Sequence, residues 1–308
     1  MAGKIPVGAT VARAYGFAFG HILTNLALIW VPVAILWAIS LFVYTPYMLA
    51  HMPTGNGDPV AIFRVMPFMF LYGIVTMVLL CAQISVLTQE ALGMRTGSSL
   101  LQLPFGPATW RVLGAFLLFC LVIFVIYFGA VLAGVIGGGI VGFATSQSGG
   151  STKLVVGLLI GVFVIFLLCA LFYIIIRLSF FLAPVAVAEK RVSLIRAWQL
   201  GQGNFWRMFT ISLSIWIPFL ILEFAFVYWM WGNALLPPFN GTPDQMAEFA
   251  RHQQEVSRQM MLNMSHVWYI TYPIGLLAGV ILYGLISGMS AFAYRALVPE
   301  GEPIPEMP

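Results

Sequence analysis

Few side chains in this sequence could carry acid–base or proton-transfer chemistry, and Glu223 is the most unusual of them. It is the one carboxylate well inside a long apolar segment. A charge inside a membrane is energetically expensive, so an ionisable residue there is a candidate functional site. Five residues separate it from Tyr228, which places it about 7–8 Å from that end of a helix. His266 and Arg64 are its best-placed candidate partners. A structural hydrogen bond, a protonated carboxyl and a solute or proton site all remain open interpretations.

Histidine and cysteine are the side chains that would signal a metal site or a nucleophile. The histidines at the same end of the molecule lack the i, i+4 spacing with which one helix presents two metal ligands; they are His51, His252 and His266. The three cysteines lie inside apolar stretches and are expected to be small apolar fillers; they are Cys81, Cys120 and Cys169. No catalytic triad, carboxylate pair or phosphate loop can be assembled. We therefore expect no enzyme activity, no metal and no cofactor.

One glycine-rich stretch matches a nucleotide-binding pattern by spacing alone. Gly137, Gly139 and Gly142 satisfy G-x-G-x-x-G, but that fingerprint needs a preceding strand and a βαβ unit. Here it falls within an apolar segment, so we interpret it as a false match. Small residues four apart favour close helix–helix contact in a membrane instead. They occur at Ala130, Gly134, Gly138 and Gly142, and again at Gly275/Gly279 and Gly284/Gly288.

The overall composition predicts the environment in which these residues work. Of 308 residues, 61% are hydrophobic and 8% are charged, against roughly 25% charged in an average soluble domain. So few charges cannot cover a water-soluble domain of this size, which indicates an all-α transmembrane bundle. The basic residues are scattered and the net charge is +4. A nucleic-acid partner is therefore not expected.

Six apolar stretches are long enough to cross a bilayer as helices. They are Ile22–Ala50, Val65–Leu87, Val112–Ala144, Leu154–Phe181, Phe205–Leu236 and Val267–Phe292. They lack the period-two alternation of barrel strands and are too long for such strands. The first stretch exceeds the ~7–15 apolar residues of a signal peptide, so we expect it to remain in the protein. Pro32 and Pro218 could interrupt the first and fifth helices.

The basic residues predict the orientation of these six helices. One side carries Lys4, Arg13, Arg95, Arg111, Arg177, Lys190, Arg191, Arg196, Arg207 and Arg295, and the other carries Arg64, Lys153, Arg251 and Arg258. The richer side is expected to be cytoplasmic, so both termini are predicted in the cytoplasm of a bacterium and the chain in its inner membrane. Arg177, Arg111 and Arg207 sit at helix ends, where long side chains can reach the headgroups.

Residues 237–266 form the largest predicted loop, on the outer side. Thr242, Pro243 and Gln245 have the types and spacing of a helix start with a capping box. A short amphipathic helix is predicted after them, with an apolar stripe made by Met246, Phe249, Val256, Met260 and Met264. We expect it to lie across the outer ends of the bundle.

An internal repeat is the most informative pattern in the sequence. Thr10–Tyr15 with Gly20-His21 resembles Ser193–Trp198 with Gly203-Asn204, and a Trp-x-Pro follows each, at Trp30 and Trp216. A weaker middle copy aligns Trp110-Arg111 with Trp206-Arg207. The predicted unit is an interfacial helix followed by two spanning helices, used three times over about 8–90, 97–185 and 192–297. Such copies would share one orientation in the membrane.

The predicted interfacial helices have an apolar and a basic side. Val11, Ala14 and Tyr15 fall on one face of the first, and Leu194, Ala197 and Trp198 on one face of the third. Arginines on the opposite face suit anionic lipid headgroups. The candidate headgroup contacts are Arg13, Arg196, Arg111 and Arg207. A plain lead-in to a span is the other interpretation of these segments.

A stretch of about 35 residues carries a resemblance to a known family. Arg177 to Lys190, followed by Ser193–Trp198 and Gly203–Trp206, resembles a bacterial pattern in the membrane domain associated with some glycerophosphodiester phosphodiesterases and in related six-span proteins. The resemblance implies a non-catalytic membrane domain, since this sequence contains no phosphodiesterase barrel. It transfers no catalytic residue.

Two classes of function fit these predictions. The first is an accessory or organising membrane component, with membrane lipids or another membrane protein as partners. The second is a transporter of a small or amphipathic solute, although such proteins usually carry several polar groups near the midplane. The accessory role is the main prediction. The sequence does not indicate an oligomeric state.

Overall fold

The computed structural model describes residues 3–51, 59–94, 105–146, 150–231, 242–266 and 268–298. These residues are almost entirely helical and contain no strand. Six helical stretches among them are long and apolar enough to cross a membrane. The predicted all-α, six-span transmembrane bundle is therefore confirmed.

Six long rods form the spans. They are α2 (Ile22–Ile39), continued by the π-helical η1 (Ser40–Tyr44) and by α3 (Thr45–His51), then α4 (Pro59–Ala91), α5 (Pro107–Ser146), α6 (Gly150–Ser179), α9 (Phe205–Trp231) and α11 (Trp268–Leu297). Shorter or polar helices join them: α1 (Val7–Gly20), α7 (Leu182–Ala188), α8 (Leu194–Leu200) and α10 (Pro243–His266). Six apolar helices suit a lipid bilayer, because a helix pairs its own backbone N–H and C=O groups and lipid chains cannot form hydrogen bonds with them.

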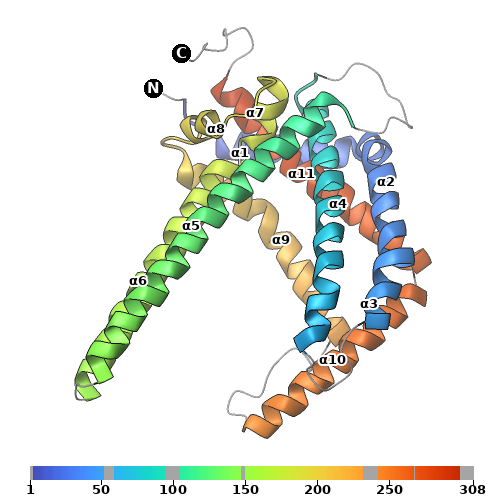
Figure 1. Cartoon of the computed structure of the whole chain (residues 1–308). Coiled ribbons are helices and arrows are strands. Elements are labelled where there is room, and N and C mark those ends of the chain that lie inside the picture. Colours follow the sequence, from blue (N-terminus) through green and yellow to red (C-terminus); the bar gives the residue numbers. More distant parts are fainter. Residues whose placement is uncertain are drawn as a thin grey trace.

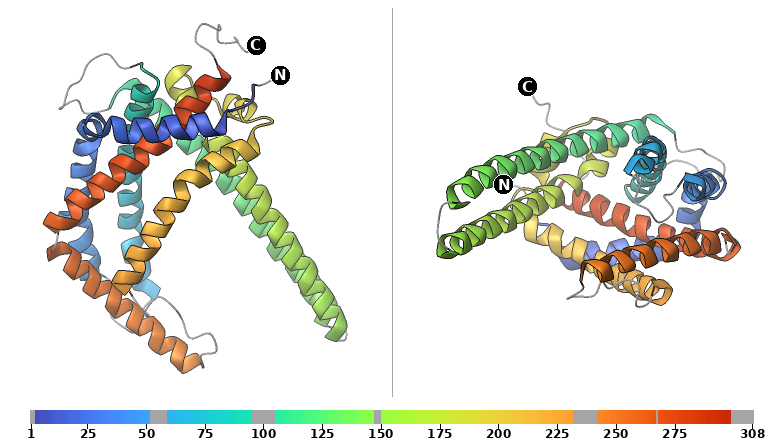
Figure 2. Two further views of the ribbon diagram at one scale, coloured as in Figure 1. Left: turned by 180° about the vertical axis from the view of Figure 1, so that it is seen from behind. Right: turned by 60° about the horizontal axis from the view of Figure 1, so that its bottom comes forward.

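The rods converge at one end and diverge at the other. The helices α1, α7 and α8 and the end of α11 gather at the top of Figure 1, which we call the α1 end. From there α5 and α6 run down together on one side, while α2, α4 and α11 run down on the other (Figures 1 and 2). The polar helix α10 lies at the opposite end, called the α10 end. The bundle is therefore splayed, with the α5–α6 hairpin as one arm.

Several predicted boundaries are corrected. The fourth span ends at Ser179, and the chain turns into the separate helix α7, so the predicted end at Phe181 falls in that turn. Pro32 and Pro218 do not interrupt α2 and α9, because a membrane helix tolerates one missing backbone hydrogen bond when its neighbours supply the rest. The irregular step in the first span is instead the π-helical segment η1.

The predicted capping box at the start of α10 is confirmed. The Thr242 N–H donates to Gln245 Oε1 over 3.0 Å, and the Gln245 N–H donates to Thr242 Oγ1 over 3.4 Å. The helix is longer than predicted, with 24 residues ending at His266. Neither glycine nor proline follows Pro243 before His266, so nothing in the sequence stops the helix early.

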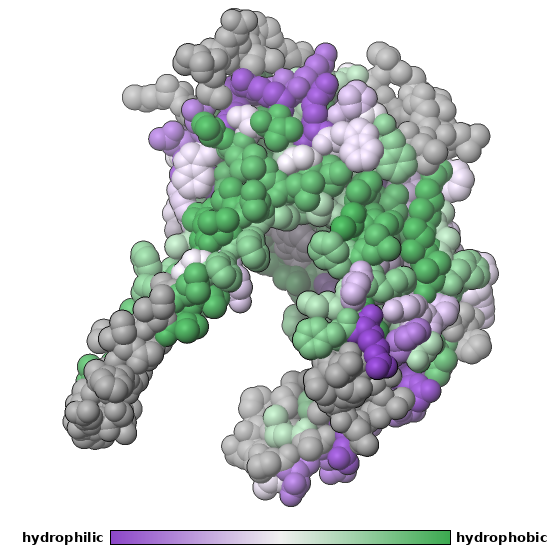
Figure 3. All heavy atoms as spheres, viewed as in Figure 1, coloured by the Kyte–Doolittle hydropathy of each residue, from purple (hydrophilic) through white to green (hydrophobic). Residues whose placement is uncertain are grey.

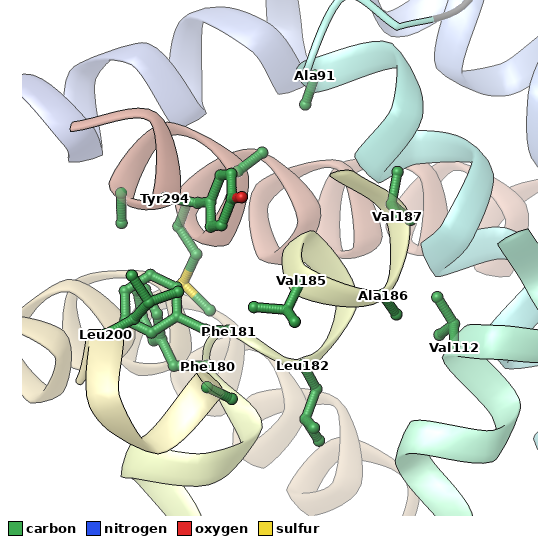
Figure 4. Packing of buried hydrophobic residues seen from close by; sticks show 14 of the residues in the cluster. Ala91, Val112, Phe180, Phe181, Leu182, Val185, Ala186, Val187, Leu200 and Tyr294 are labelled. Atoms are coloured by element: carbon green, nitrogen blue, oxygen red, sulfur yellow. The ribbon is translucent and has the colours of Figure 1, made fainter. Parts of the chain in front are cut away.

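The core is concentrated at the α1 end, around α7. Phe181, Leu182, Val185 and Val187 are buried there, and Figure 4 shows Phe181 and Val185 on the side of Leu200 of α8 and Tyr294 of α11. Most of α7 is apolar, so this one helix contributes to contacts with α4, α5, α6, α8 and α11. The close packing joins the short helices α7 and α8 to the spans.

Helix α1 packs against α11 rather than lying free on a membrane surface. Ideal Cβ atoms built on Gly284 and Gly288 would lie 3.5 Å and 3.3 Å from the Cα atoms of Ala18 and Ala14. The predicted role of these glycines in close helix contact is confirmed. The face of α1 that contains Ala14 is thus covered by α11, because the two glycines of α11 leave room for α1 to approach closely.

The order of elements matches two copies of the predicted repeat unit. Short α1 precedes the first two spans, and short α8 precedes α9 and α11. The interfacial helix of the middle copy would fall within residues 95–104, which lie outside the described residues. The threefold repeat stays a prediction.

Candidate functional site

Among the six candidate spans of the described residues, those of the α5–α6 hairpin are the least buried. In the most apolar 18-residue window of each of its spans, 11% of the residues are buried, against 50% in the window of α11. Phe124 of α5 and Phe166 of α6 are 60% and 70% exposed. Figure 3 shows apolar side chains continuing from the core onto this arm. The hairpin therefore presents a long apolar surface that this chain leaves uncovered.

Small residues on the hairpin are uncovered too. A Cβ atom added at Gly129, Gly134 or Gly161 would meet nothing within 4 Å, whereas Gly284 and Gly288 of α11 are in close contact with α1. Helix α5 continues through the false nucleotide-binding pattern, which confirms that no βαβ unit is present there. The side-chain surroundings of Gly138 and Gly142 lie outside the described part. The predicted helix–helix contact at Gly134 is not made by any of the described residues.

A buried carboxylate, Glu189, joins elements at the α1 end, next to the base of the hairpin. Its side chain is fully buried, and its oxygens accept hydrogen bonds from Arg191 Nη2 over 2.6 Å and Arg196 Nε over 2.9 Å. The Tyr294 hydroxyl donates to Glu189 Oε1 over 3.2 Å. We call these four residues the Glu189 cluster. Because Tyr294 belongs to α11, the cluster fastens the α7–α8 connection to the last span.

Local geometry explains why Glu189 points inward. Lys190, the next residue, has a φ of 54°, a left-handed conformation that reverses the chain direction after α7. Lys190 is exposed while Glu189 is buried. Ser193 then begins α8, where its side chain accepts a hydrogen bond from the Arg196 N–H. This cap places Arg196 one turn into α8, within reach of the carboxylate.

Arg177, at the end of α6, is also held inside the protein. Its guanidinium carbon lies 3.8 Å from the centre of the Trp198 ring, and Nη1 donates to the Tyr173 hydroxyl over 2.7 Å. The residue is 8% exposed. The expected extension of Arg177 toward lipid headgroups is therefore wrong, because its guanidinium is buried in a cation–π contact with Trp198 inside the protein.

A second fastening joins the N-terminal segment to the start of α9. Asn204 Oδ1 accepts from the Ile5 N–H over 3.2 Å, and its Nδ2 donates to the Gly3 carbonyl over 3.0 Å. Arg207 Nη1 donates to the Ile5 carbonyl over 2.8 Å. Backbone N–H and carbonyl groups of residues 3–5 are thus paired with two side chains about 200 residues later in the sequence. We call these contacts of Asn204 and Arg207 the N-terminal clasp.

Replacing Asn204 by alanine is expected to release residues 3–6 from the bundle. The substitution removes both amide contacts and leaves buried Ile5 with an unpaired N–H, at a cost of about 1–3 kcal/mol. Hydrogen exchange measured by mass spectrometry should show faster exchange of the N-terminal peptide, with α4 and α11 unchanged. Gln202→Ala, at an exposed position two residues before Asn204, is the control. Equal protection in Asn204→Ala and the unsubstituted chain would show that the clasp does not hold the segment.

The structure gives each predicted site residue a distinct setting. Glu223 and Arg64 are both exposed, and no ion pair joins them within the described part of the chain; the Tyr47 hydroxyl donates to the Arg64 carbonyl. The side chain of His266 lies outside the described residues, so its pairing with Glu223 stays a prediction.

The four predicted headgroup arginines also differ from one another. Arg13 is exposed and Arg111 half-buried, in keeping with access to the surface. Arg196 and Arg207 instead have protein partners, Glu189 and the Ile5 carbonyl. Lipid contact stays a prediction for all four. Sequence reasoning missed Glu189, although an acidic residue followed by Lys190 and Arg191 in an otherwise apolar stretch could have indicated a charge cluster.

Comparison with known proteins adds no identity. No family model matches this sequence, and neither the curated proteins nor the solved structures contain a match. The resemblance to the phosphodiesterase-associated membrane domain therefore stays a prediction. In the residues that the structure describes, no group of three His, Cys, Asp or Glu side chains could hold a metal ion.

Proposed function

We propose that this protein is a non-catalytic accessory component of the membrane, which organises a second membrane protein by packing its α5–α6 hairpin against that partner's helices. The exposure of the hairpin carries the proposal, because both of its spans are far less covered than α11. Small residues at Gly129 and Gly134 would allow a partner helix to approach closely.

The rest of the fold supports this role. The Glu189 cluster and the N-terminal clasp fix the α1 end, so the hairpin projects from a closely packed base (Figure 1). A rigid base reduces the conformational entropy that is lost when a partner binds. The excess of Lys and Arg at the α1 end supports placing that end, with both termini, in the cytoplasm of a bacterial cell, with the spans in the inner membrane.

Two native cysteines allow a direct test. Cys120 of α5 and Cys169 of α6 are exposed on the hairpin. Chains that retain one of them, with the other two cysteines replaced by alanine, would be labelled with a photoreactive maleimide and irradiated in native membranes. We expect one adduct of defined mass from each hairpin cysteine, because a specific interface places one partner beside both positions. Mass spectrometry then identifies the partner.

The matched control is an exposed apolar position on another span. Phe70 of α4 is 71% exposed, and Phe70→Cys in a chain without other cysteines should give no protein adduct. Adducts only with lipid from Cys120 and Cys169, or the same protein adducts from Phe70→Cys, would contradict the proposed partner surface.

Transport of a small or amphipathic solute is the second candidate, and buried polar atoms favour it. In the described residues of α2, α4 and α11, side-chain oxygens of Asn25, Gln83, Thr88 and Ser287 are buried without a hydrogen-bond partner. Unpaired polar groups are costly inside a membrane and occur where a solute passes. Uptake assays in vesicles that compare Gln83→Leu and Glu223→Gln with the unsubstituted chain test this candidate; no uptake by any of them would exclude the solutes assayed.

A further inference from the structure

A cavity of about 660 Å³ lies between the hairpin and the other spans. Its volume is within the usual range of small-molecule sites, roughly 300–1,000 Å³. Helices α4, α5, α6, α7, α9 and α11 all contribute to its wall. The cavity thus lies where the two arms of the splayed bundle meet, and Phe116 and Phe172 of the hairpin form part of its wall.

The helix α7 closes the cavity at the α1 end. The lining residues of α4 and α11 lie two to four turns before the ends of those helices, and those of α5 and α9 lie within about three turns of their starts. Helix α7 packs against α4, α5, α6 and α11 at this end. Leu182 and Ala183 of α7 line the cavity themselves. Because α7 is packed in the core and followed at once by the Glu189 cluster, this wall is fixed (Figure 4).

The exposure of the lining residues locates the mouth. On α4 and α11, Cys81 and Met289 are 1% and 6% exposed, so the wall is closed there. On α6 and α9, Phe172 and Trp216 are 49% and 42% exposed. The cavity therefore opens sideways along α6 and α9, at a depth where the surroundings of a spanning helix are lipid chains.

The chemistry of the wall selects the occupant. No charged residue lines the cavity, so a charged solute would lose its hydration without gaining a partner. One lining hydroxyl is already used within its own helix, since Ser290 Oγ donates to the Ser287 carbonyl over 3.1 Å. Water is also a poor filler, because apolar cavities stay dry. A flexible hydrocarbon chain satisfies all of these conditions.

We propose that this cavity is a binding site for one acyl chain of a membrane lipid, which enters sideways between α6 and α9 and ends beneath α7. The chain fills a volume that would otherwise cost the lining residues their packing contacts. Its headgroup stays outside the cavity, since the walls offer it no charged partner. The site would hold a lipid in a fixed position within the protein, whether or not a protein partner binds the hairpin.

The test uses a lipid that marks what its chain touches. The full-length protein is reconstituted in vesicles of phosphatidylethanolamine and phosphatidylglycerol that contain a phosphatidylcholine with a diazirine in one acyl chain. After irradiation, mass spectrometry maps the inserted lipid. We expect label at Cys81 and Met289, which bulk lipid cannot reach, as well as at exposed Phe124 of the hairpin.

A larger side chain in the wall should exclude the lipid chain. Ser212→Phe on α9 is expected to reduce the label at Cys81 and Met289, relative to the label at Phe124, by at least about fivefold. Thr210→Phe, on an exposed position of the same helix, should leave this ratio unchanged. Circular dichroism and gel filtration check that both variants fold.

Either of two results would overturn the proposal. Label confined to lipid-exposed residues of the unsubstituted chain would show that no acyl chain enters, and this result does not depend on any variant. Label at Cys81 that persists in a folded Ser212→Phe protein would place the chain elsewhere. Loss of the hairpin's protein adducts would leave the lipid labelling unaffected, so the two proposals fail separately.

Discussion

Replacing Glu189 by glutamine is expected to lower the free energy of unfolding by about 3 kcal/mol, the low end of the cost of removing one partner from a buried ion pair. Arg191 and Arg196 would keep their positive charges beside a neutral amide, at a site where the side chain of residue 189 is fully buried. Because both arginines are partly exposed, water relieves part of this cost. Unfolding in mixed detergent micelles, followed by circular dichroism, measures the difference.

Glu90→Gln is the control for loss of charge. Glu90 lies in the last turn of α4 and is half-buried, and the described residues show no ion pair at it. Its substitution should change stability by less than about 0.5 kcal/mol. Tyr294→Phe removes one hydrogen bond of the Glu189 cluster and should cost about 1 kcal/mol. Similar stabilities of Glu189→Gln and Glu90→Gln would show that the cluster does not fasten α7 to α11.

Replacing Gly288 by valine should be similarly damaging, at about 2–3 kcal/mol. A Cβ atom at this position would lie 3.2 Å from Phe17 Cδ1 and 3.3 Å from the Cα of Ala14. The phenylalanine ring can turn, but the backbone of α1 can only move away. Two further methyl groups would therefore separate α1 from α11. The expected result is a lower midpoint of unfolding together with faster hydrogen exchange in α1.

Gly73→Val tests whether valine itself is tolerated in a span. A Cβ atom at Gly73 of α4 would meet nothing within 4 Å, so this substitution should leave the midpoint nearly unchanged. The prediction for Gly288 fails if the two valine variants unfold at the same detergent concentration, or if α1 keeps its protection in Gly288→Val.

The number and type of spans could be predicted because the signal for them is local. Each span is a continuous apolar stretch, and a bilayer requires such stretches to be helical. The cap at Thr242 could be predicted for the same reason, since both of its partners lie within four residues. The end of the fourth span could not be read in this way. Phe181 and Leu182 are as apolar as the span before them, and the turn between α6 and α7 depends on packing against distant helices.

The settings of the polar residues depended on distant partners and were largely unforeseen. In the sequence, Arg196 lies on the polar face of a predicted amphipathic helix, which suggests contact with lipid headgroups. In the structure it pairs with Glu189, in the connection before α8. Arg207 pairs with the carbonyl of Ile5, about 200 positions earlier. Periodicity reports which face of a helix is polar, but it does not distinguish a face toward lipid headgroups from a face toward a buried carboxylate.

The contact between α1 and α11 forms late in the synthesis of the chain. About 250 residues separate the end of α1 at Gly20 from the start of α11 at Trp268. At a translation rate of roughly 5–20 residues per second, the ribosome needs about 12–50 s to make them. During that interval Ala14 and Ala18 lack the helix that covers them in the finished protein. The packing surface of α1 is therefore complete only after α11 has been made.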